Sequence, residues 1–390
     1  MKRKSVLFLA LLLLGIPVLT ACQHQTEKQI IRVGHNQSNV HPTHIGMQAF
    51  EKYVEAHLGD KYDVEVFPSE LLGSQNEMVQ LTQTGAITFV VASNSLLETF
   101  SKDYSIFNLP YLFSSSEAYH AAMDDPAVYG PIFESTKQSG IQALTWIDAG
   151  SRSFYTIDRP IMKPEDLKGL KIRVQQSPTN VKMMELLGGS ATPMGFGEVY
   201  TALQSKMLDG AENNEMALKD NGHGDVCKYY SYDLHQMIPD FFLVNSSFWE
   251  ALSAEDRAVF EEACKVMNQV EREAWSKGIE EAKIYAKEKQ GVQFFYPDVQ
   301  AFQEVLMPMH EQFLAANPKL QAVYDLLQKH NQEALKETAE ANSEAPTELA
   351  TEAEASSEAA RKGETASKAE ATSVQDATKT QESSSEVNHG

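Results

Sequence analysis

The strongest constraint on the fold is a regular alternation of strand and helix patterns in the first hundred residues. Alternating apolar residues in QIIRVGHN (29–36) and YDVEVFP (62–68) predict two half-buried strands, and the apolar run AITFVVAS (86–93) predicts a buried third strand. Helical patterns lie between them at 43–59 and 73–85, and each ends at a glycine. Because this order requires crossover helices between parallel strands, we predict a parallel α/β sheet.

A second alternation and one very long helical pattern follow. The segments concerned are strands at 140–150, 170–174 and 241–247 and helices at 177–189 and 197–210. The part from Gln25 to Gln332, roughly 300 residues, is long for one core, so we predict two α/β lobes with a hinged cleft. The pattern at 253–291 predicts a helix of about 35 residues that runs across both lobes, with Ser253 as its cap.

The amino-terminal segment MKRKSVLFLALLLLGIPVLTAC has the features of an export signal. Three cations precede an apolar run, Val6 to Val18, which is too short for a stable membrane span. Small residues before Cys22 are typical of a bacterial lipobox, with cleavage before Cys22 and acylation of its thiol. We therefore expect a lipoprotein signal peptide at 1–21, a lipidated linker at 22–29 and an extracytoplasmic protein tethered to the outer face of the cell membrane. An ordinary secretory signal with a chance cysteine is the alternative.

Charge and composition limit the function of the chain and of its carboxyl end. The formal net charge of −21 disfavours nucleic-acid binding, which requires a basic surface. Residues 331–390 are rich in Ala, Glu, Ser and Thr, and from Glu333 onward they include no aromatic residue. Such a segment buries too little apolar surface to offset its ordering entropy, so we predict an acidic, low-complexity, disordered tail with transient helix at most.

No pattern indicates a metal, a cofactor or catalysis. Cys227 and Cys264 lack histidines at zinc-ligand spacing; a disulfide between them is open but not implied. His41 and His44 have no further ligand cluster nearby, and we interpret them as a solvated pair. The chain contains neither a glycine-rich phosphate loop after a strand nor a GxSxG elbow. We therefore predict a protein that is not an enzyme and binds no cofactor.

Polar residues follow several of the predicted strands, where ligands bind in open α/β sheets. Asn36 ends the first strand, Ser93 ends the third, and Arg152 follows the strand at 140–150. Arg173 lies between Ile172 and Val174, so strand alternation places it opposite their buried face. From alternation alone, Arg173 is either a solvated surface residue or a ligand-binding residue, because its guanidinium fork matches a carboxylate.

Three motifs in the second half of the chain identify a family resemblance. PEDLKGLKIRV (164–174), EVYTALQ (198–204) and DGAEN (209–213), in this order and spacing, closely resemble the extracytoplasmic solute-binding proteins of tripartite ATP-independent periplasmic (TRAP) transporters, the DctP family. VGHN, FPSELLGSQNEM and NLPYLF also resemble the family, and the likeness covers nearly all of Ile30 to Leu327.

The resemblance implies a two-lobed periplasmic-binding-protein-like fold of type II-like architecture. A long helix then spans both hinged lobes, which close on an organic acid. We expect the first lobe to comprise 30–150 and 239–278, and the second to comprise 151–238 and 279–330. The implied partners are an organic acid anion and the small and large membrane subunits of a TRAP permease, with no role for nucleic acid.

The resemblance also assigns roles in ligand binding. Arg173 falls on the family arginine that pairs with the ligand carboxylate, and Arg152 on a second family arginine. The other implied ligand-binding positions are Asn213, Phe196, Asn36, Gln75, Ser93, Asn214, His235 and Asp240. Phe196 falls on an aromatic position that stacks over the ligand in relatives. Some sialic-acid receptors have glutamate where this chain has Ser93, which argues against sialic acid.

The charges at these positions favour a particular ligand class. Two arginines serve one anionic end, and the remaining positions are mostly amides and hydroxyls, with one acid at Asp240. A second ligand carboxylate would need a second cation at the far end, so we predict a polyhydroxylated monoacid, a hexuronate or related sugar acid. A C4-dicarboxylate or keto-acid receptor is the alternative. A sensor that presents its closed form to a signalling kinase and an extracytoplasmic enzyme are further hypotheses.

Overall fold

The structure, a computed structural model, describes residues 27–344. The predicted signal peptide, the lipid-acceptor Cys22 and the tail beyond residue 344 lie outside the described residues. None of the described helices is long and apolar enough to cross a bilayer.

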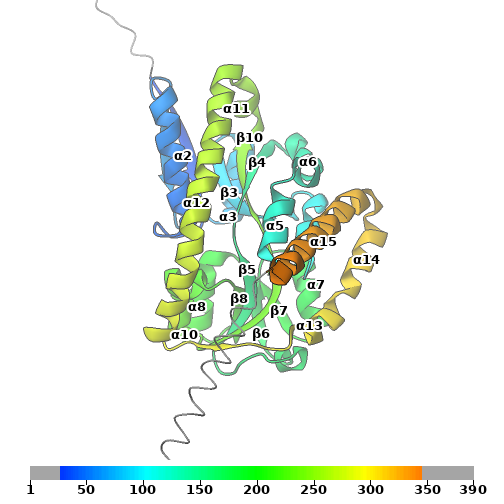
Figure 1. The fold of residues 1–390 in the computed structure, drawn as a ribbon. Coiled ribbons are helices and arrows are strands. Elements are labelled where there is room, and N and C mark those ends of the chain that lie inside the picture. The colour runs from blue at the N-terminus through cyan, green and yellow to red at the C-terminus, as the bar shows by residue number, and fades with distance from the viewer. Residues whose placement is uncertain (1–26, 345–390) are drawn as a thin grey trace, which may run out of the picture. The chain divides into compact units, whose positions relative to one another are not determined.

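The described strands form two separate β-sheets (Figure 1). The first sheet has the order β2-β1-β3-β10-β4, with bounds Tyr62–Phe67, Gln29–Gly34, Phe89–Ser93, Asp240–Asn245 and Ile141–Ile147. The second has the order β11-β9-β5-β8-β6-β7, with bounds Gln293–Phe295, Tyr229–Met237, Ser151–Thr156, Gly210–Asn213, Lys171–Val174 and Ser190–Pro193. Each sheet is the centre of one lobe, and the two lobes belong to one compact unit that ends at Gln332.

Helices cover both sheets. The α-helices are α2 (Pro42–Leu58), α3 (Gln75–Thr84), α4 (Asn94–Leu97), α5 (Ser116–Met123), α6 (Pro126–Glu134), α7 (Pro178–Leu186), α8 (Val199–Gln204), α9 (Met216–Asp220), α10 (His223–Val226), α11 (Ser246–Ala251), α12 (Ala254–Glu288), α13 (Val299–Leu306), α14 (Pro308–Ala316) and α15 (Gln321–Glu344). Short 3-10 turns are η1 (Lys102–Asn108), η2 (Lys137–Ser139), η3 (Pro164–Leu167), η4 (Phe196–Glu198) and η5 (Pro318–Leu320).

The predicted fold class is confirmed. β1 pairs in parallel with β2 and β3, as the alternation at the start of the chain requires. β10, from the second half of the chain, inserts antiparallel between β3 and β4. The chain therefore connects the two lobes more than once: it leaves the first lobe after β4, returns for β10, and leaves again through α12.

The long helix α12 has the predicted length and start. It contains 35 residues, and the Ser253 hydroxyl accepts a hydrogen bond from the backbone of Asp256 at 3.0 Å. α12 packs against α2 in the first lobe and α9 in the second, and Figure 1 shows it passing beside both sheets. One face of the first sheet is thereby buried in a core that includes Phe50, Phe242 and Phe260.

Parts of the second lobe differ from the sequence prediction. The strands β5, β8 and β9 were not predicted, and the helical pattern at 197–210 forms a helix only as far as Gln204. Lys206, two residues beyond, adopts a φ of +57°, a left-handed conformation that an α-helix does not continue through. Cys227 and Cys264 are both buried, and they form no disulfide.

The predicted start of the disordered tail and the lobe assignment of the residues before it also differ from the structure. Residues 331–344, which we predicted to be disordered, continue α15, in keeping with the high helix propensity of Ala, Glu and Lys. Residues 279–330 were assigned to the second lobe, yet Leu320, Val323 and Leu327 pack in a core cluster of the first lobe. Helical spacing shows that such leucines are buried, but it does not show which core they join.

Candidate ligand-binding cleft

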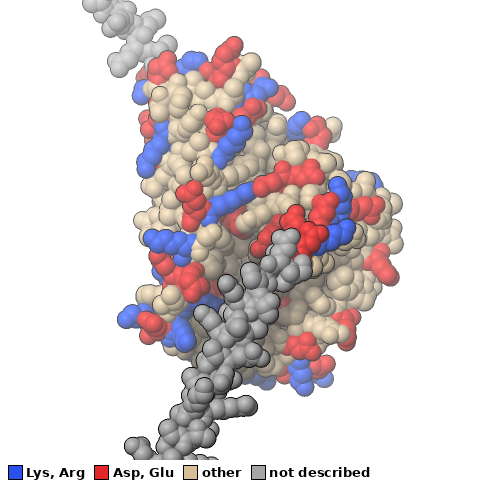
Figure 2. Space-filling view, in the orientation of Figure 1, with Lys and Arg blue, Asp and Glu red and all other residues tan. Residues whose placement is uncertain are grey.

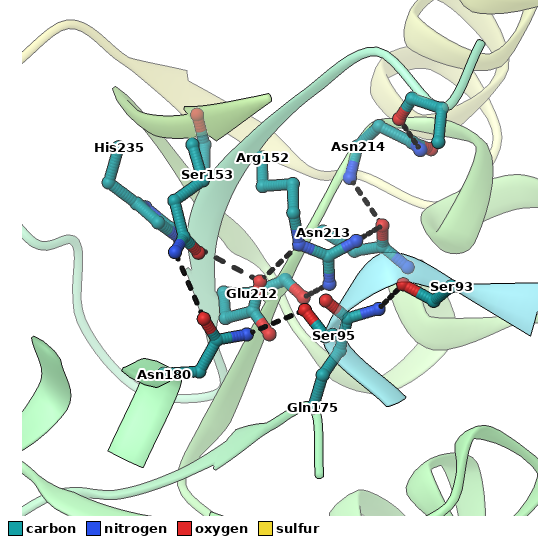
Figure 3. Close-up of polar contacts among 12 residues, drawn as sticks. Ser93, Ser95, Arg152, Ser153, Gln175, Asn180, Glu212, Asn213, Asn214 and His235 are labelled. Carbon is teal, nitrogen blue, oxygen red and sulfur yellow. Dashed lines mark hydrogen bonds and ion pairs between the residues drawn. The ribbon is translucent and has the colours of Figure 1, made fainter. Parts of the chain in front are cut away.

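A cavity lies where the two sheets meet, and its walls come from both lobes. The side chains and turns that line it are Asn36, Gln37, His41, Thr43, Ser74, Gln75, Ser93, Leu96, Asp148, Ala149, Arg152, Arg173, Gln175, Gln176, Met194, Gly195, Phe196, Asn213, Asn214, Asp240 and Trp275. Most are polar, and several of them appear in Figure 3. Figure 2 shows that acidic and basic side chains are interspersed on one outer face of the molecule.

Sheet topology explains why distant residues meet in the first lobe. Ser93 is the last residue of β3, and Asp148 directly follows β4. Asp240 begins β10, which runs antiparallel to both, and it lies opposite Ser93 and Ile147 in the register. The beginning of β10 and the ends of its neighbours therefore share one sheet edge, where ligands of open α/β sheets bind.

The second lobe contributes its cations in the same way. Arg152 lies near the start of β5, and Asn213 ends the antiparallel neighbour β8. Arg173 lies in β6, which pairs in parallel with β8 on the other side. Both arginines are only 4% exposed. Arg173 is thus buried, whereas strand alternation placed it opposite the buried face, because both faces of this sheet are covered.

Arg152 is compensated by the protein itself. Its Nε donates to Glu212 at 2.5 Å, Nη1 donates to the Asn213 side chain at 2.8 Å, and Nη2 donates to the Glu212 carbonyl at 2.8 Å. Figure 3 shows the guanidinium between these two partners. Burial opposes the charge on Glu212, but Arg152 and, after it, His235 outweigh burial and lower the pKa of Glu212 to about 2. Arg152 therefore brings little net charge to the cavity.

A buried row of charges continues behind Arg152. His235 Nδ1 lies 2.7 Å from Asp233, and its Nε2 lies 3.7 Å from Glu212. Burial lowers the pKa of His235, but the two carboxylates outweigh burial and raise it to about 9. His235 is therefore a protonated residue that stacks on Phe154 beneath the cavity, and it is not among the lining residues.

Arg173 has a different set of partners. Its Nε and Nη2 both donate to the Met194 carbonyl, at 3.2 and 2.9 Å, and the guanidinium lies 5.7 Å from the centre of the Phe196 ring. Within residues 27–344, no carboxylate forms an ion pair with it. Glu212 and Glu70 favour its charge from beyond ion-pair distance. A guanidinium has five N–H donors, so Arg173 keeps donors for an anion in the cavity.

Several buried amides of the cavity also lack partners. Three buried side-chain atoms form no hydrogen bond within the described part of the protein: Asn36 Oδ1, Gln75 Nε2 and Gln175 Oε1. Buried polar atoms are nearly always paired in proteins, so three such atoms lining one cavity indicate a polar ligand. They include both donors and acceptors, which suits hydroxyl groups because a hydroxyl can serve both.

Hydrogen bonds across the cavity join the two lobes. Gln175 of the second lobe donates to Ser93 of the first at 2.8 Å, and Asn214 donates to the Ala149 carbonyl at 3.0 Å. Ser93 in turn hydrogen-bonds Asp240, whose pKa burial raises to about 6. The structure is therefore that of a cleft whose lobes are in contact.

The predicted site residues fall together in one place. All of them except His235 line the cavity. Trp275, Asp148 and His41, by contrast, line it without having been assigned a role in ligand binding. The interpretation of His41 and His44 as solvated is wrong: they are 3% and 7% exposed, and His44 bonds His35. Their position at the start of a helix with an apolar face is the sequence signal that could have indicated their burial.

Comparison with protein families gives one match. The model of the DctP family, described as bacterial extracellular solute-binding protein, family 7, matches residues 33–317. The protein YiiZ of Salmonella typhimurium is 40% identical over 290 residues, which cover 74% of this chain and 88% of that protein.

Solved structures show the same fold. A TRAP periplasmic solute-binding protein of Anaerococcus prevotii, with bound D-glucuronate, is 63% identical with a TM-score of 0.78, covering 78% of this chain and 99% of that one. A TRAP protein of a Sulfitobacter species, with bound β-D-galacturonate, is 31% identical with a TM-score of 0.74, covering 77% of this chain and 100% of that one.

Proposed function

This chain belongs to the DctP family of extracellular solute-binding proteins, the receptors of TRAP transporters, and we propose that its cleft binds a hexuronate. The observation that carries the proposal is the contrast between the two cavity arginines. Arg152 is neutralised by Glu212, whereas Arg173 forms no ion pair with a described carboxylate. One such cation fits a ligand with one carboxylate.

The rest of the cavity supports a ligand rich in hydroxyl groups. The unpaired amide atoms of Asn36, Gln75 and Gln175 offer donors and acceptors, and Asp240 offers an acceptor. Phe196, beside Arg173, presents an aromatic ring of the kind that packs on a sugar ring. The two solved relatives described above bind glucuronate and galacturonate, which are sugars with one carboxylate.

The mechanism follows from where these groups lie. The side chains that would contact the ligand come from both lobes, so only the closed arrangement allows all of them to contact one ligand. Ligand binding therefore favours closure. We propose that the closed form delivers the ligand to a membrane permease without chemical change. We further propose that the acylated Cys22 tethers the receptor to the membrane surface.

Calorimetry with Arg173 variants tests the function. We expect the wild-type protein to bind glucuronate or galacturonate more tightly than succinate or malate. Arg173→Ala should weaken hexuronate binding by about 2–5 kcal/mol, as expected for loss of one partner of a buried charge pair. Arg173→Lys should restore only part of the affinity, because lysine lacks the planar fork.

The matched control is Arg159→Ala. Arg159 belongs to the same lobe, but it is exposed, and its guanidinium donates to the backbone carbonyls of Asp166 and Lys168. Its loss should leave affinity unchanged. Binding of succinate without binding of any hexuronate would contradict the ligand class, and unchanged affinity in Arg173→Ala would contradict the role of the arginine.

A further inference from the structure

We propose that Asp148 is a specificity-determining residue, which accepts a hydrogen bond from a hydroxyl of the sugar acid and repels ligands with a carboxylate there. This inference rests on the proposed function, since it concerns the same cleft. Asp148 was not among the residues that sequence patterns indicated, and its case comes from its placement and its neighbours.

The carboxylate of Asp148 is held in a fixed orientation at the cavity wall. The residue is 5% exposed and lines the cavity. Its Oδ1 accepts from the backbone of Gly150 at 2.9 Å, and its Oδ2 lies 2.7 Å from His120 Nε2. A carboxylate has about four acceptor sites, so each oxygen keeps capacity for a ligand hydroxyl.

The turn that carries Asp148 is built for close packing. Gly150 has a φ of +62°, which favours glycine, and a Cβ at this position would lie 2.7 Å from the ring of Trp275. Trp275 also lines the cavity. The short turn between β4 and β5, which carries Asp148, therefore packs against Trp275 at Gly150.

His120 supports this carboxylate from the opposite side. It lies on α5, outside the lining set, and its side chain is 38% exposed whereas that of Asp148 is 6% exposed. The imidazole thus bonds Oδ2 of Asp148 from a helix that does not line the cavity. His120 is a positioning residue, because it acts on a ligand only through Asp148.

Other acids gather at the same end of the cavity. Burial raises the pKa of the Tyr119 hydroxyl, and the nearby carboxyls of Asp148, Asp240 and Glu271 raise it further. Burial, and after it the neighbouring carboxylate of Asp148, raises the pKa of Glu271 well above its usual range. Of these acids, Asp148 and Asp240 line the cavity.

This arrangement makes the cavity bipolar. Arg173, the cavity arginine that forms no ion pair within residues 27–344, lies in the second lobe, and the two aspartates lie at the sheet edge of the first. A hydroxyl that meets the aspartates donates a charge-assisted hydrogen bond, whereas a carboxylate that meets them is repelled. Selection of monoacids over diacids follows from the same residues that bind the hydroxyls.

Calorimetry at pH 7.5 with Asp148→Asn tests the inference, because asparagine keeps the size and one acceptor but removes the charge. The ligands are glucuronate and the linear pair gluconate and glucarate, which differ only in a terminal hydroxymethyl or carboxylate. We expect Asp148→Asn to weaken glucuronate binding about tenfold or more and to reduce the preference for gluconate over glucarate at least as much. Asp63→Asn, an exposed change of equal charge on β2, should change neither.

A second variant keeps the test decisive if Asp148→Asn unfolds. His120→Gln leaves the charge of Asp148 in place, so it should weaken glucuronate binding while retaining the preference for gluconate. The inference is overturned if folded Asp148→Asn binds glucuronate within twofold of wild type, or if His120→Gln abolishes the preference for gluconate. If wild type binds neither linear acid, the glucuronate affinities alone decide. Absence of all hexuronate binding by wild type would instead overturn the proposed function.

Discussion

At the scale of single residues, the neighbours of a charge determine what it can do. Arg152 and Arg173 are equally buried and both line the cavity. Glu212 forms an ion pair with Arg152, whereas Arg173 contacts a carbonyl and an aromatic ring and forms no ion pair within residues 27–344. Arg152 is therefore better suited to orient Asn213, and Arg173 to bind an anion. No spacing of residues in the sequence distinguishes these two roles.

His235 predicts a specific dependence of stability on pH. Its pKa of about 9 in the folded protein exceeds the ordinary value of 6.5. The folded state therefore binds the proton more tightly, so this stabilisation is fully present below pH 6.5 and is lost as pH rises through 9. The shift corresponds to about 3 kcal/mol of unfolding free energy. Denaturant titrations between pH 6.5 and 9.5 should show the loss.

Two variants test whether His235 causes this dependence of stability on pH. His235→Gln should be less stable at pH 6.5 and should show a much flatter decline toward pH 9.5. His57→Gln replaces an exposed histidine on α2 and should retain the wild-type slope. If His235→Gln declines as steeply as wild type, the charge on His235 does not explain the dependence.

The extent to which the site was predictable depends on the kind of residue. Arg173, Asn213 and Phe196 lie in motifs whose order and spacing are specific, so a resemblance located them. Asp148 and Trp275 were missed because an aspartate after a strand and a tryptophan in a long helix have ordinary local patterns. Only the packing of α12 beside the turn at Gly150 brings them to the same cavity.

At the scale of elements, close helix packing joins the first lobe to α12. A Cβ at Gly46 of α2 would lie 2.9 Å from Glu271 Cβ and 3.3 Å from the Met267 carbonyl. Gly278, farther along α12, packs similarly against Met216 of α9 and Pro42 of α2. These two glycines allow α12 to pack closely against α2 in the first lobe and α9 in the second. The helix that passes beside the cavity is therefore held against both lobes.

This packing predicts opposite effects for two glycine substitutions. Gly46→Val should lower the free energy of unfolding by about 1–3 kcal/mol, because a backbone carbonyl blocks the added methyl groups. Gly130→Ala, in α6, has no atom within 4 Å of the added Cβ and should stabilise by up to about 1 kcal/mol through helix propensity. Chemical denaturation of both variants measures the difference. A stabilising Gly46→Val would show that the two helices can separate without cost.

Strand prediction succeeded in the first lobe and failed in part of the second for a physical reason. β1 and β2 alternate in polarity, since β2 is an edge strand of its sheet and its face is partly solvated. β8 is buried along its whole length and includes charged Glu212, and β9 carries the buried Asp233 and His235. Buried charges that pair with one another hide the periodicity on which strand prediction depends.

At the scale of the whole molecule, the chain alternates between its two lobes. It enters the second lobe after β4, returns at β10, crosses on α12, and contributes α13 and α14 to the second lobe before η5 and α15. Asn331 donates to the Leu112 carbonyl at 2.8 Å and accepts from the backbone of Ser114 at 3.0 Å. The last segment before Gln332 therefore belongs to the folded receptor.

Truncation at two positions tests where the receptor ends. A chain that ends at Gln332 retains Leu320, Val323 and Leu327, which are at most 4% exposed, and the bonds of Asn331. It should bind hexuronate and unfold as the full chain does. A chain that ends at Pro318 lacks these three apolar side chains, each of which contributes about 1.5–3 kcal/mol on burial. It should lose at least about 5 kcal/mol of stability. Thermal unfolding and calorimetry on both distinguish the cases. If removing residues after Gln332 weakens binding, the end of α15 or the segment after it contributes to the receptor, because Leu320, Val323 and Leu327 are retained in that chain.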